Sequence, residues 1–118
     1  MTFAGKHLTK ADLARREAIH AGHCMACIQR GIDVSGQGVV QWHHTAGKKH
    51  HDLTCGLCFW HHLARPFPGL THADMRRDYG PSLLDGSKPF HAEFGSNESL
   101  LARQNEYLGA TNDGYNGE

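Results

Sequence analysis

Two motifs in this sequence combine cysteines and histidines at spacings that suit metal binding. The first is "CMAC", and the second is "CGLCFWHH", which follows about thirty positions later. Each motif contains two cysteines separated by two residues, and this gap lets a tight turn present two thiolates to one ion. The residues that could act as ligands are Cys24, Cys27, Cys55, Cys58 and His61.

These five candidates exceed the four ligands of a tetrahedral zinc site. Either Cys55 with Cys58 or Cys58 with His61 could complete it, since both pairs have the same gap. The distance along the chain from Cys27 to Cys55 is longer than in usual zinc fingers, so the ion should bind across an inserted hairpin. A redox C-x-x-C is the alternative, but it requires a thioredoxin-like βαβ context that the sequence does not indicate.

A histidine pair, His43 and His44, ends a short apolar run. Adjacent side chains on a strand point to opposite faces, so one imidazole can bind an ion while the other serves a different partner. Two exposed histidines at a strand end are the simpler interpretation of this pair alone. A second pair, His61 and His62, starts a predicted helix that should pack against this strand, and it favours a functional site.

Composition indicates one small domain that depends on a metal. The chain has 118 residues, and domains of this size often need a metal or disulfides for stability. Histidine is enriched, with 11 residues, and the dense part of the set lies mid-chain: His43, His44, His50, His51, His61 and His62. A run of solvated imidazoles or a tag would be contiguous or terminal, whereas these are interleaved with apolar residues and cysteines.

Charge and hydropathy restrict the compartment and the partners. No apolar run approaches the roughly 18 residues of a membrane span, and the first residues lack the apolar core of a signal peptide. We therefore expect a cytoplasmic protein without membrane contact, in which the cysteines are thiolate ligands and not disulfides. The net charge of +0 argues against a nucleic-acid coat protein. Lys48 and Lys49 could contact phosphates or simply form a solvated face.

Periodicity and turn signals predict an α+β fold that is rich in loops. Thr9 and Asp12 have the spacing of a capping box at the start of a helix over 9–21. The elements expected after it are a strand over 39–42, a returning strand over 52–57, a helix over 59–64 stopped by Pro66, a short helix from Thr71, irregular chain over 81–95 and a helix over 97–108. We expect an N-terminal extension at 1–8, one domain at 9–108 and a disordered tail at 109–118.

The order of four motifs resembles a known family. A cysteine pair, a strand that ends in "HH", a returning strand and "LC-x-x-HH" at the start of a helix are similar to the HNH nucleases, and the motifs "CMAC", "QWHHTAG", "LCFWHH" and "FHAEFGSNESLL" match one type of them in order. Within that superfamily the sequence most resembles the phage Ref-type, RecA-dependent recombination-enhancement nucleases, over roughly residues 13–108. The resemblance implies a small zinc-stabilised ββα-metal (HNH) finger between an N-terminal and a C-terminal helix.

Roles for individual residues follow from the resemblance. His44 corresponds to the general base, and His43 and His62 correspond to ligands of a catalytic divalent ion, Mg(II), Mn(II) or Zn(II). The ligands of a structural zinc correspond to Cys24, Cys27, Cys58 and His61, with Cys55 as a buried strand residue or alternative ligand. The family's further helix histidine falls at Pro66, so we expect His72 to replace it. The residue that supports the base falls near His50, His51 or Asp52, which the sequence does not separate.

These roles predict a metal-dependent DNA endonuclease with weak sequence preference in a bacterial host or phage. A RecA-type filament or another phage or host recombination protein is the expected partner. Two other functions fit the same residues. One is a non-catalytic zinc module that docks DNA or protein, and the other is an RNA nuclease on the same finger.

Overall fold

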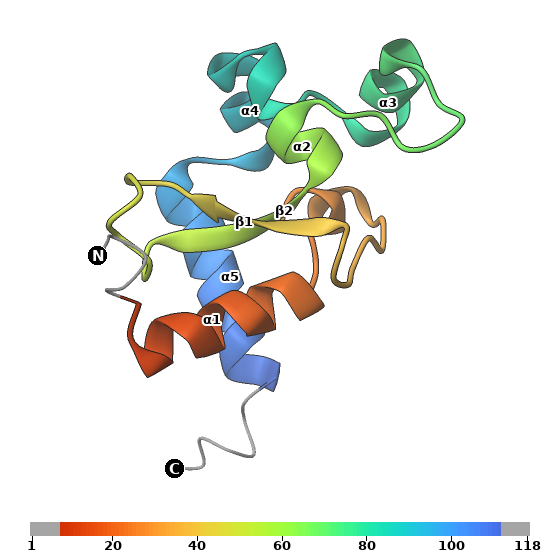
Figure 1. Cartoon of the computed structure of the whole chain (residues 1–118). Coiled ribbons are helices and arrows are strands. Elements are labelled where there is room, and N and C mark those ends of the chain that lie inside the picture. Colours follow the sequence, from red (N-terminus) through yellow and green to blue (C-terminus); the bar gives the residue numbers. More distant parts are fainter. Residues whose placement is uncertain (1–7, 112–118) are drawn as a thin grey trace.

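The computed structural model describes residues 8–111, which form an α+β fold with a two-stranded antiparallel sheet (Figure 1). In chain order its elements are α1 (Lys10–Ala21), η2 (Cys27–Arg30), β1 (Val40–His44), β2 (Thr54–Cys58), α2 (Phe59–Leu63), α3 (His72–Tyr79), η3 (Leu83–Asp85), α4 (Ser87–Phe94) and α5 (Asn97–Thr111). Within this range no helix is long and apolar enough to cross a membrane.

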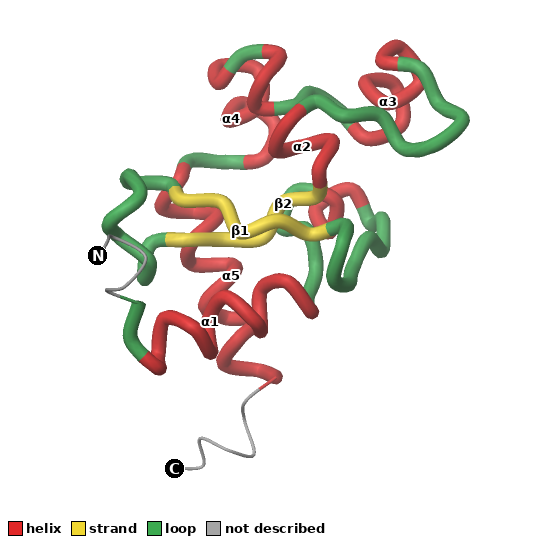
Figure 2. The backbone as a smooth tube through the Cα atoms, viewed as in Figure 1, coloured by secondary structure: helices red, strands yellow, loops and turns green. Residues whose placement is uncertain are grey.

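The hairpin of β1 and β2 forms the centre of the fold, with α2 continuing directly from β2. Its register pairs Val40 with Cys58 and His43 with Cys55. Directly paired residues share a face of the sheet, and successive residues alternate between faces. His43 and His44 therefore lie on opposite faces. In the view of Figures 1 and 2, α1 lies below the hairpin, α5 passes behind it and continues downward, and α2, α3 and α4 lie above it.

Helix α1 is fixed at both its N-terminus and its sheet-facing side. The capping box predicted from the sequence is present, since Thr9 and Asp12 exchange hydrogen bonds between side chains and backbone. Further along the helix, Arg15 donates from Nε to Oγ1 of Thr54 (2.9 Å) and from Nη2 to the Thr54 carbonyl (2.6 Å). These bonds attach α1 to the first residue of β2.

The middle of β2 is crowded because α1 approaches it closely at Gly56. A Cβ atom at this position would lie 2.7 Å from Cγ1 of Val40 and 3.2 Å from Cγ2 of Ile19. The backbone of Gly56 is also bonded away from β1. Its N–H donates to Oε1 of Gln104 on α5 (2.8 Å), and its carbonyl accepts from the N–H of Met25 (2.9 Å).

The chain after β2 packs around two buried aromatic contacts. Trp60 of α2 is fully buried and donates its indole N–H to the carbonyl of Gly80, just after α3 (2.9 Å). The ring of His61, the next residue of α2, contacts the rings of Phe90 and Phe94 of α4, with centroids 6.2 and 4.9 Å away, respectively. Helices α3 and α4 are therefore held against α2.

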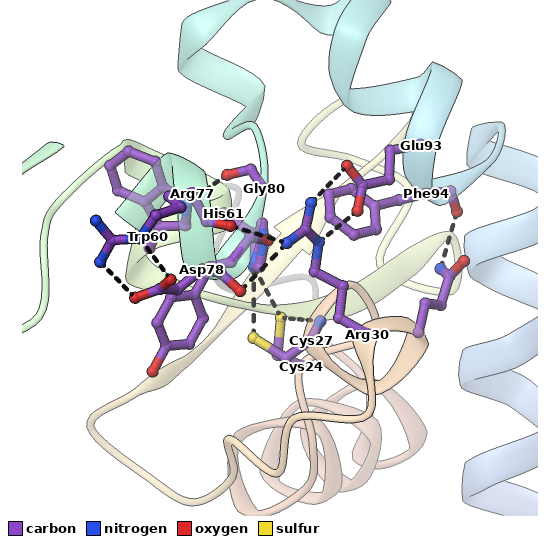
Figure 3. A network of polar contacts seen from close by, with 12 residues as sticks. Cys24, Cys27, Arg30, Trp60, His61, Arg77, Asp78, Gly80, Glu93 and Phe94 are labelled. Atoms are coloured by element: carbon purple, nitrogen blue, oxygen red, sulfur yellow. Dashed lines mark hydrogen bonds and ion pairs between the residues drawn. The ribbon is translucent and has the colours of Figure 1, made fainter. Parts of the chain in front are cut away.

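Arg30, in the turn that carries the first cysteine pair, joins these helices together. Its guanidinium donates Nε and Nη2 to the two carboxylate oxygens of Glu93 on α4 (2.5 and 3.0 Å). Its Nη1 donates to the carbonyl of Asp78 in α3 (3.2 Å; Figure 3). One side chain thus connects the N-terminal turn to both helices that follow α2.

The structure has the helices and strands in the predicted order, but the prediction for residues 81–95 is wrong. Residues 81–95 are not irregular, because η3 and α4 occupy most of them. Helix α4 begins after Gly86, carries Pro89 in its first turn, where proline is tolerated, and buries Phe90 and Phe94 at helical spacing. Helix α2 ends at Leu63, and Ala64 adopts a left-handed conformation (φ 56°) ahead of Pro66.

The boundaries predicted at the ends of the chain fall largely outside the described residues. This holds for residues 1–7 of the N-terminal extension and for residues 112–118 of the tail. Helix α5 continues through Gly109 to Thr111, beyond the predicted end at 108. Ser96 supports its start, since Oγ of Ser96 accepts from the N–H of Ser99 (3.1 Å).

Candidate functional site

Three cysteines and one histidine converge in the buried interior. Cys24 and Cys27 come from the turn that leads into η2, Cys58 is the last residue of β2, and His61 lies on α2. All four are buried, and their potential ligand atoms lie within 4.8 Å of one another. This set is the only group of three or more such ligands found within residues 8–111. Figure 3 shows the sulfur atoms of Cys24 and Cys27 facing the ring of His61.

The distances within this group suit a tetrahedral zinc ion. Nδ1 of His61 lies 3.5 Å from Sγ of Cys24, 3.5 Å from Sγ of Cys27 and 3.3 Å from Sγ of Cys58. The Sγ atoms of Cys27 and Cys58 are 3.8 Å apart. Ordinary Zn–S and Zn–N lengths at tetrahedral angles give about 3.6 Å between sulfur and nitrogen and about 3.8 Å between two sulfurs. The four side chains are therefore placed to bind a structural metal such as zinc.

Backbone groups around the cluster hold the ligands in position. Nε2 of His61 donates to the carbonyl of Tyr79 (2.8 Å), which leaves the lone pair of Nδ1 directed at the sulfurs. The N–H groups of Cys27 and His61 donate to Sγ of Cys24 (3.4 Å) and Sγ of Cys58 (3.5 Å), respectively. The hydroxyl of Ser82 also donates to the carbonyl of His61 (3.2 Å). Tyr79 acts through its backbone carbonyl and Ser82 through its hydroxyl, and no motif in the sequence indicates either residue.

The protonation of the thiols also indicates a site for a cation. Burial opposes ionisation of Cys24, but interactions within the cluster, with the hydrogen bonds from the thiols of Cys27 and Cys58 foremost, outweigh it and lower the pKa of Cys24. The bond to Cys24 raises the pKa of Cys27 strongly and raises the pKa of Cys58 to about 12. A cation bound among these sulfurs would favour the thiolate form of all three cysteines.

The fourth ligand position belongs to His61, and Cys55 is elsewhere. Cys55 pairs with His43 across the hairpin, whereas Cys58 pairs with Val40. Two residues three positions apart on a strand point to opposite faces, so Cys55 and Cys58 cannot both face the cluster. Burial raises the pKa of Cys55 to about 12, and it is an uncharged core thiol. Strand alternation was the signal in the sequence that could have excluded Cys55.

Gln41, His43 and His62 form a second group of polar side chains. This group lies on the face of the hairpin opposite to the face that carries His44. The rings of His43 and His62 have centroids 5.0 Å apart, and Nδ1 of His62 bonds to Oε1 of Gln41 (2.8 Å). Burial, followed by the charge of His62, lowers the pKa of His43 to about 4, and burial also lowers the pKa of His62. Both imidazoles are neutral near pH 7 and so can bind a metal ion. Gln41 was not predicted, although its place two residues before His43 puts it on the same face.

His44 belongs to a separate aromatic group at the end of β1. Its Nε2 lies 3.1 Å from Nδ1 of His51, and both rings contact the ring of Trp42, with centroids 4.5 and 5.3 Å away. Burial and then the neighbouring charge of His51 lower the pKa of His44. Of the three residues that the sequence left open as a partner of His44, the structure brings His51 to it.

The remaining predicted residues lie apart from these groups. Lys48 and Lys49 are exposed on the loop between β1 and β2. His72 is exposed at the first position of α3, where its ring contacts that of Trp60 at a centroid distance of 5.6 Å. Within residues 8–111, no metal-binding group of three or more combines His72 with His43 and His62. The role of His72 as a ligand of the catalytic ion stays a prediction.

Comparison with known protein families gives a match over most of the chain. Residues 9–109 match the family described as "recombination enhancement, RecA-dependent nuclease". No curated protein matches the sequence.

Proposed function

Because the chain belongs to the family of recombination-enhancement, RecA-dependent nucleases, we propose that it is a metal-dependent DNA endonuclease of the HNH type. In this proposal His44 is the general base, and His43 with His62 holds one divalent ion. The cluster of Cys24, Cys27, Cys58 and His61 (hereafter the Cys3His cluster) holds a structural zinc.

The observation that supports this proposal most strongly is that two consecutive residues of α2 contact two different groups of potential metal ligands. His61 faces the three sulfurs, and His62 faces His43 on β1. A hairpin followed directly by such a helix forms the ββα arrangement in which a structural metal supports the element that carries a catalytic ligand. A module that only docks DNA or protein has no need for the second histidine pair.

The proposed role of His44 depends on its neutral form. Its imidazole accepts a proton from a water molecule, which attacks the scissile phosphorus in line with the 3′ oxygen. In the tautomer that suits this role, Nε2–H of His44 donates to Nδ1 of His51, and Nδ1 of His44 is the proton acceptor. His51 thereby orients the base. The products are a 5′ phosphate and a 3′ hydroxyl.

The ligand chemistry at His43 and His62 suits a divalent ion. Both side chains are half-buried and neutral, and Gln41 fixes the ring of His62. A divalent ion bound there, Mg(II), Mn(II) or Zn(II), supplies positive charge that stabilises the phosphate and the departing oxygen.

The proposed substrate is DNA, recognised through its backbone. Phosphate contacts from exposed Lys48 and Lys49 would position the duplex but carry little sequence information. Choice of the cleavage site is then left to a partner, a RecA-type filament or another phage or host recombination protein, in the cytoplasm of a bacterial host. The family match supports this assignment.

The test is plasmid nicking with Mg(II) or Mn(II), with and without a RecA filament. We expect His44→Ala to abolish nicking, since a general base contributes about 10²–10⁴-fold, while zinc content and thermal unfolding stay at wild-type values. His50→Ala, which removes an exposed histidine from the loop between β1 and β2 and keeps the proposed base, serves as the control and should cleave as the wild type does. If His44→Ala cuts DNA as fast as the wild type, the proposed mechanism is wrong. Cleavage of matched duplex RNA but not DNA would make the protein an RNA nuclease.

A further inference from the structure

Arg16 of α1 lies beside the ring group that contains the proposed base. Its guanidinium carbon is over the ring of Trp42, 5.7 Å from the centroid. The same ring contacts His44 and His51, with centroids 4.5 and 5.3 Å away. The negative face of an indole attracts a guanidinium and leaves its N–H groups available to other acceptors. Trp42 therefore holds a cation next to the base without using the hydrogen-bonding capacity of that cation.

The guanidinium of Arg16 is half-buried and has no acceptor in the described part of the chain, where it makes neither a hydrogen bond nor an ion pair. Its neighbour Arg15 is used differently, since it donates from Nε and Nη2 to Thr54. Asp12, one turn earlier on α1, accepts a backbone N–H within the capping box. Arg16 thus keeps five N–H donors in the planar arrangement that matches the oxygens of a phosphate.

Helix α1 runs alongside β1 in the opposite direction. Arg16 contacts Trp42, and Nδ1 of His20, one turn later, donates to the carbonyl of Val40 (2.9 Å). One turn of helix advances about 6 Å, and two strand residues advance about 6.8 Å, so the two elements stay in step. Alternate residues of a strand share a face, and Val40, Trp42 and His44 therefore face the same side of the hairpin. A DNA strand that reaches His44 from this side passes Arg16.

A surface hollow of about 390 Å³ adjoins Arg16 toward the start of β1. Its lining residues are Arg16, Glu17, His20, Gln37 and Gly38. Among the described residues, the backbone N–H groups of Gln37 and Gly38 make no hydrogen bond, so both can donate to an anion. Glu17 is the one acidic side chain in the lining, and it is exposed. The hollow therefore continues the row of free donors that begins at Arg16.

We propose that Arg16, held on Trp42, binds a phosphate of the DNA backbone that flanks the scissile phosphate, and that the hollow receives the backbone beyond it. The inference rests on the proposed function, because it takes His44 as the position of cleavage. Arg16 donates two parallel hydrogen bonds to the phosphate oxygens, and the turn before β1 donates its N–H groups to the next phosphate. These contacts fix how the strand lies on His44 and carry no base identity.

The test measures DNA binding apart from cleavage. Fluorescence anisotropy is recorded with two duplexes of unrelated sequence, at several salt concentrations and without added divalent ion. For Arg16→Gln we expect the Kd to rise about ten-fold for both duplexes. The slope of log Kd against log salt concentration should become shallower by about 0.9, the value for one lost phosphate contact. Zinc content and unfolding temperature should stay at wild-type values, because the guanidinium bonds to no other described group.

Three further variants serve as comparisons. Lys88→Gln removes one exposed positive charge from α4, which lies above the hairpin in Figure 1 whereas α1 lies below it, and should bind as the wild type does. Arg16→Lys keeps the charge but loses the planar fork, so it should restore the salt slope and only part of the affinity. Glu17→Gln removes the carboxylate from the hollow and should lower the Kd.

The outcomes separate this inference from the proposed function. If the wild type fails to nick DNA, the proposed function is wrong and this inference falls with it. If the wild type nicks DNA and Arg16→Gln binds both duplexes with wild-type affinity and salt slope, only the role of Arg16 is wrong. The proposal is also overturned if Arg16→Gln weakens binding to one sequence alone, which would indicate a base contact, or if Lys88→Gln weakens binding as much. Weaker binding by Glu17→Gln would exclude the hollow from the path of the DNA backbone.

Discussion

Two cysteines on β2 provide a matched test of the Cys3His cluster. Cys55 and Cys58 are both fully buried and lie on the same five-residue strand. Cys58 is placed to bind the metal, and Cys55 is on the opposite face of the hairpin. Replacing each by alanine removes the same sulfur atom from the core, so the difference between the two variants isolates the contribution of the metal.

The expected effects differ severalfold. Structural zinc contributes about 10–16 kcal/mol of apparent binding free energy in small domains, so each of four ligands accounts for about 3 kcal/mol if the contribution is shared evenly. Cys58→Ala should therefore lower the free energy of unfolding by about 3 kcal/mol or more, a large part of the ~5–15 kcal/mol of a typical domain. Cys55→Ala loses only packing, on the order of 1 kcal/mol.

The assay combines metal analysis with thermal unfolding. Wild type and Cys55→Ala should each retain about one zinc per chain after gel filtration, and a strong chelator should unfold both. Cys58→Ala should retain little zinc and should unfold well below both, by more than about 10 °C. Zinc retained in Cys58→Ala but lost from Cys55→Ala would refute the ligand assignment. An unchanged unfolding temperature after chelation of the wild type would show that the metal does not stabilise the fold.

Two further substitutions test the packing that positions the site. Gly56→Ala should cost about 1–3 kcal/mol in urea unfolding, because the added Cβ lies 2.7 Å from Cγ1 of Val40; Gly109→Ala, with nothing within 4 Å of its Cβ, should cost nothing. Equal stability of these two variants would show that the space above Gly56, between Val40 of β1 and Ile19 of α1, is not tightly packed. Arg30→Met should cost about 1–2 kcal/mol by removing the hydrogen bonds to Glu93 and to the α3 carbonyls, whereas Glu93→Gln keeps the latter and should cost less. A larger loss in Glu93→Gln than in Arg30→Met would contradict this interpretation.

Local signals in the sequence predicted much of the metal cluster and the hairpin. The two-residue gap in "CMAC" predicted that Cys24 and Cys27 share one metal site, and strand alternation predicted that His43 and His44 lie on opposite faces. Both predictions depend only on residues close together in the sequence, and the structure agrees with both. The capping box of Thr9 and Asp12 is another local pattern, and it is present. Such features are predictable because the residues that define them are fixed relative to one another by the backbone geometry of one element.

Features that depend on contacts between distant elements were not predicted. His72 was expected to replace the helix histidine that the family resemblance places at Pro66, and the contact of its ring with Trp60 was not anticipated. Residues 81–95 were expected to be irregular because two prolines and two glycines interrupt them. Their helices are short, and burial of Phe90 and Phe94 against α2 stabilises α4 more than helix propensity does.

The bonds that Gly56 makes away from β1 affect how the hairpin can meet other chains. An uncovered outer strand exposes N–H and C=O groups that can template a third strand from another molecule. At the middle of β2 these groups are already taken, one by the side chain of Gln104 and the other by the N–H of Met25. Strand addition along this border is therefore blocked, which protects the hairpin against intermolecular β-aggregation.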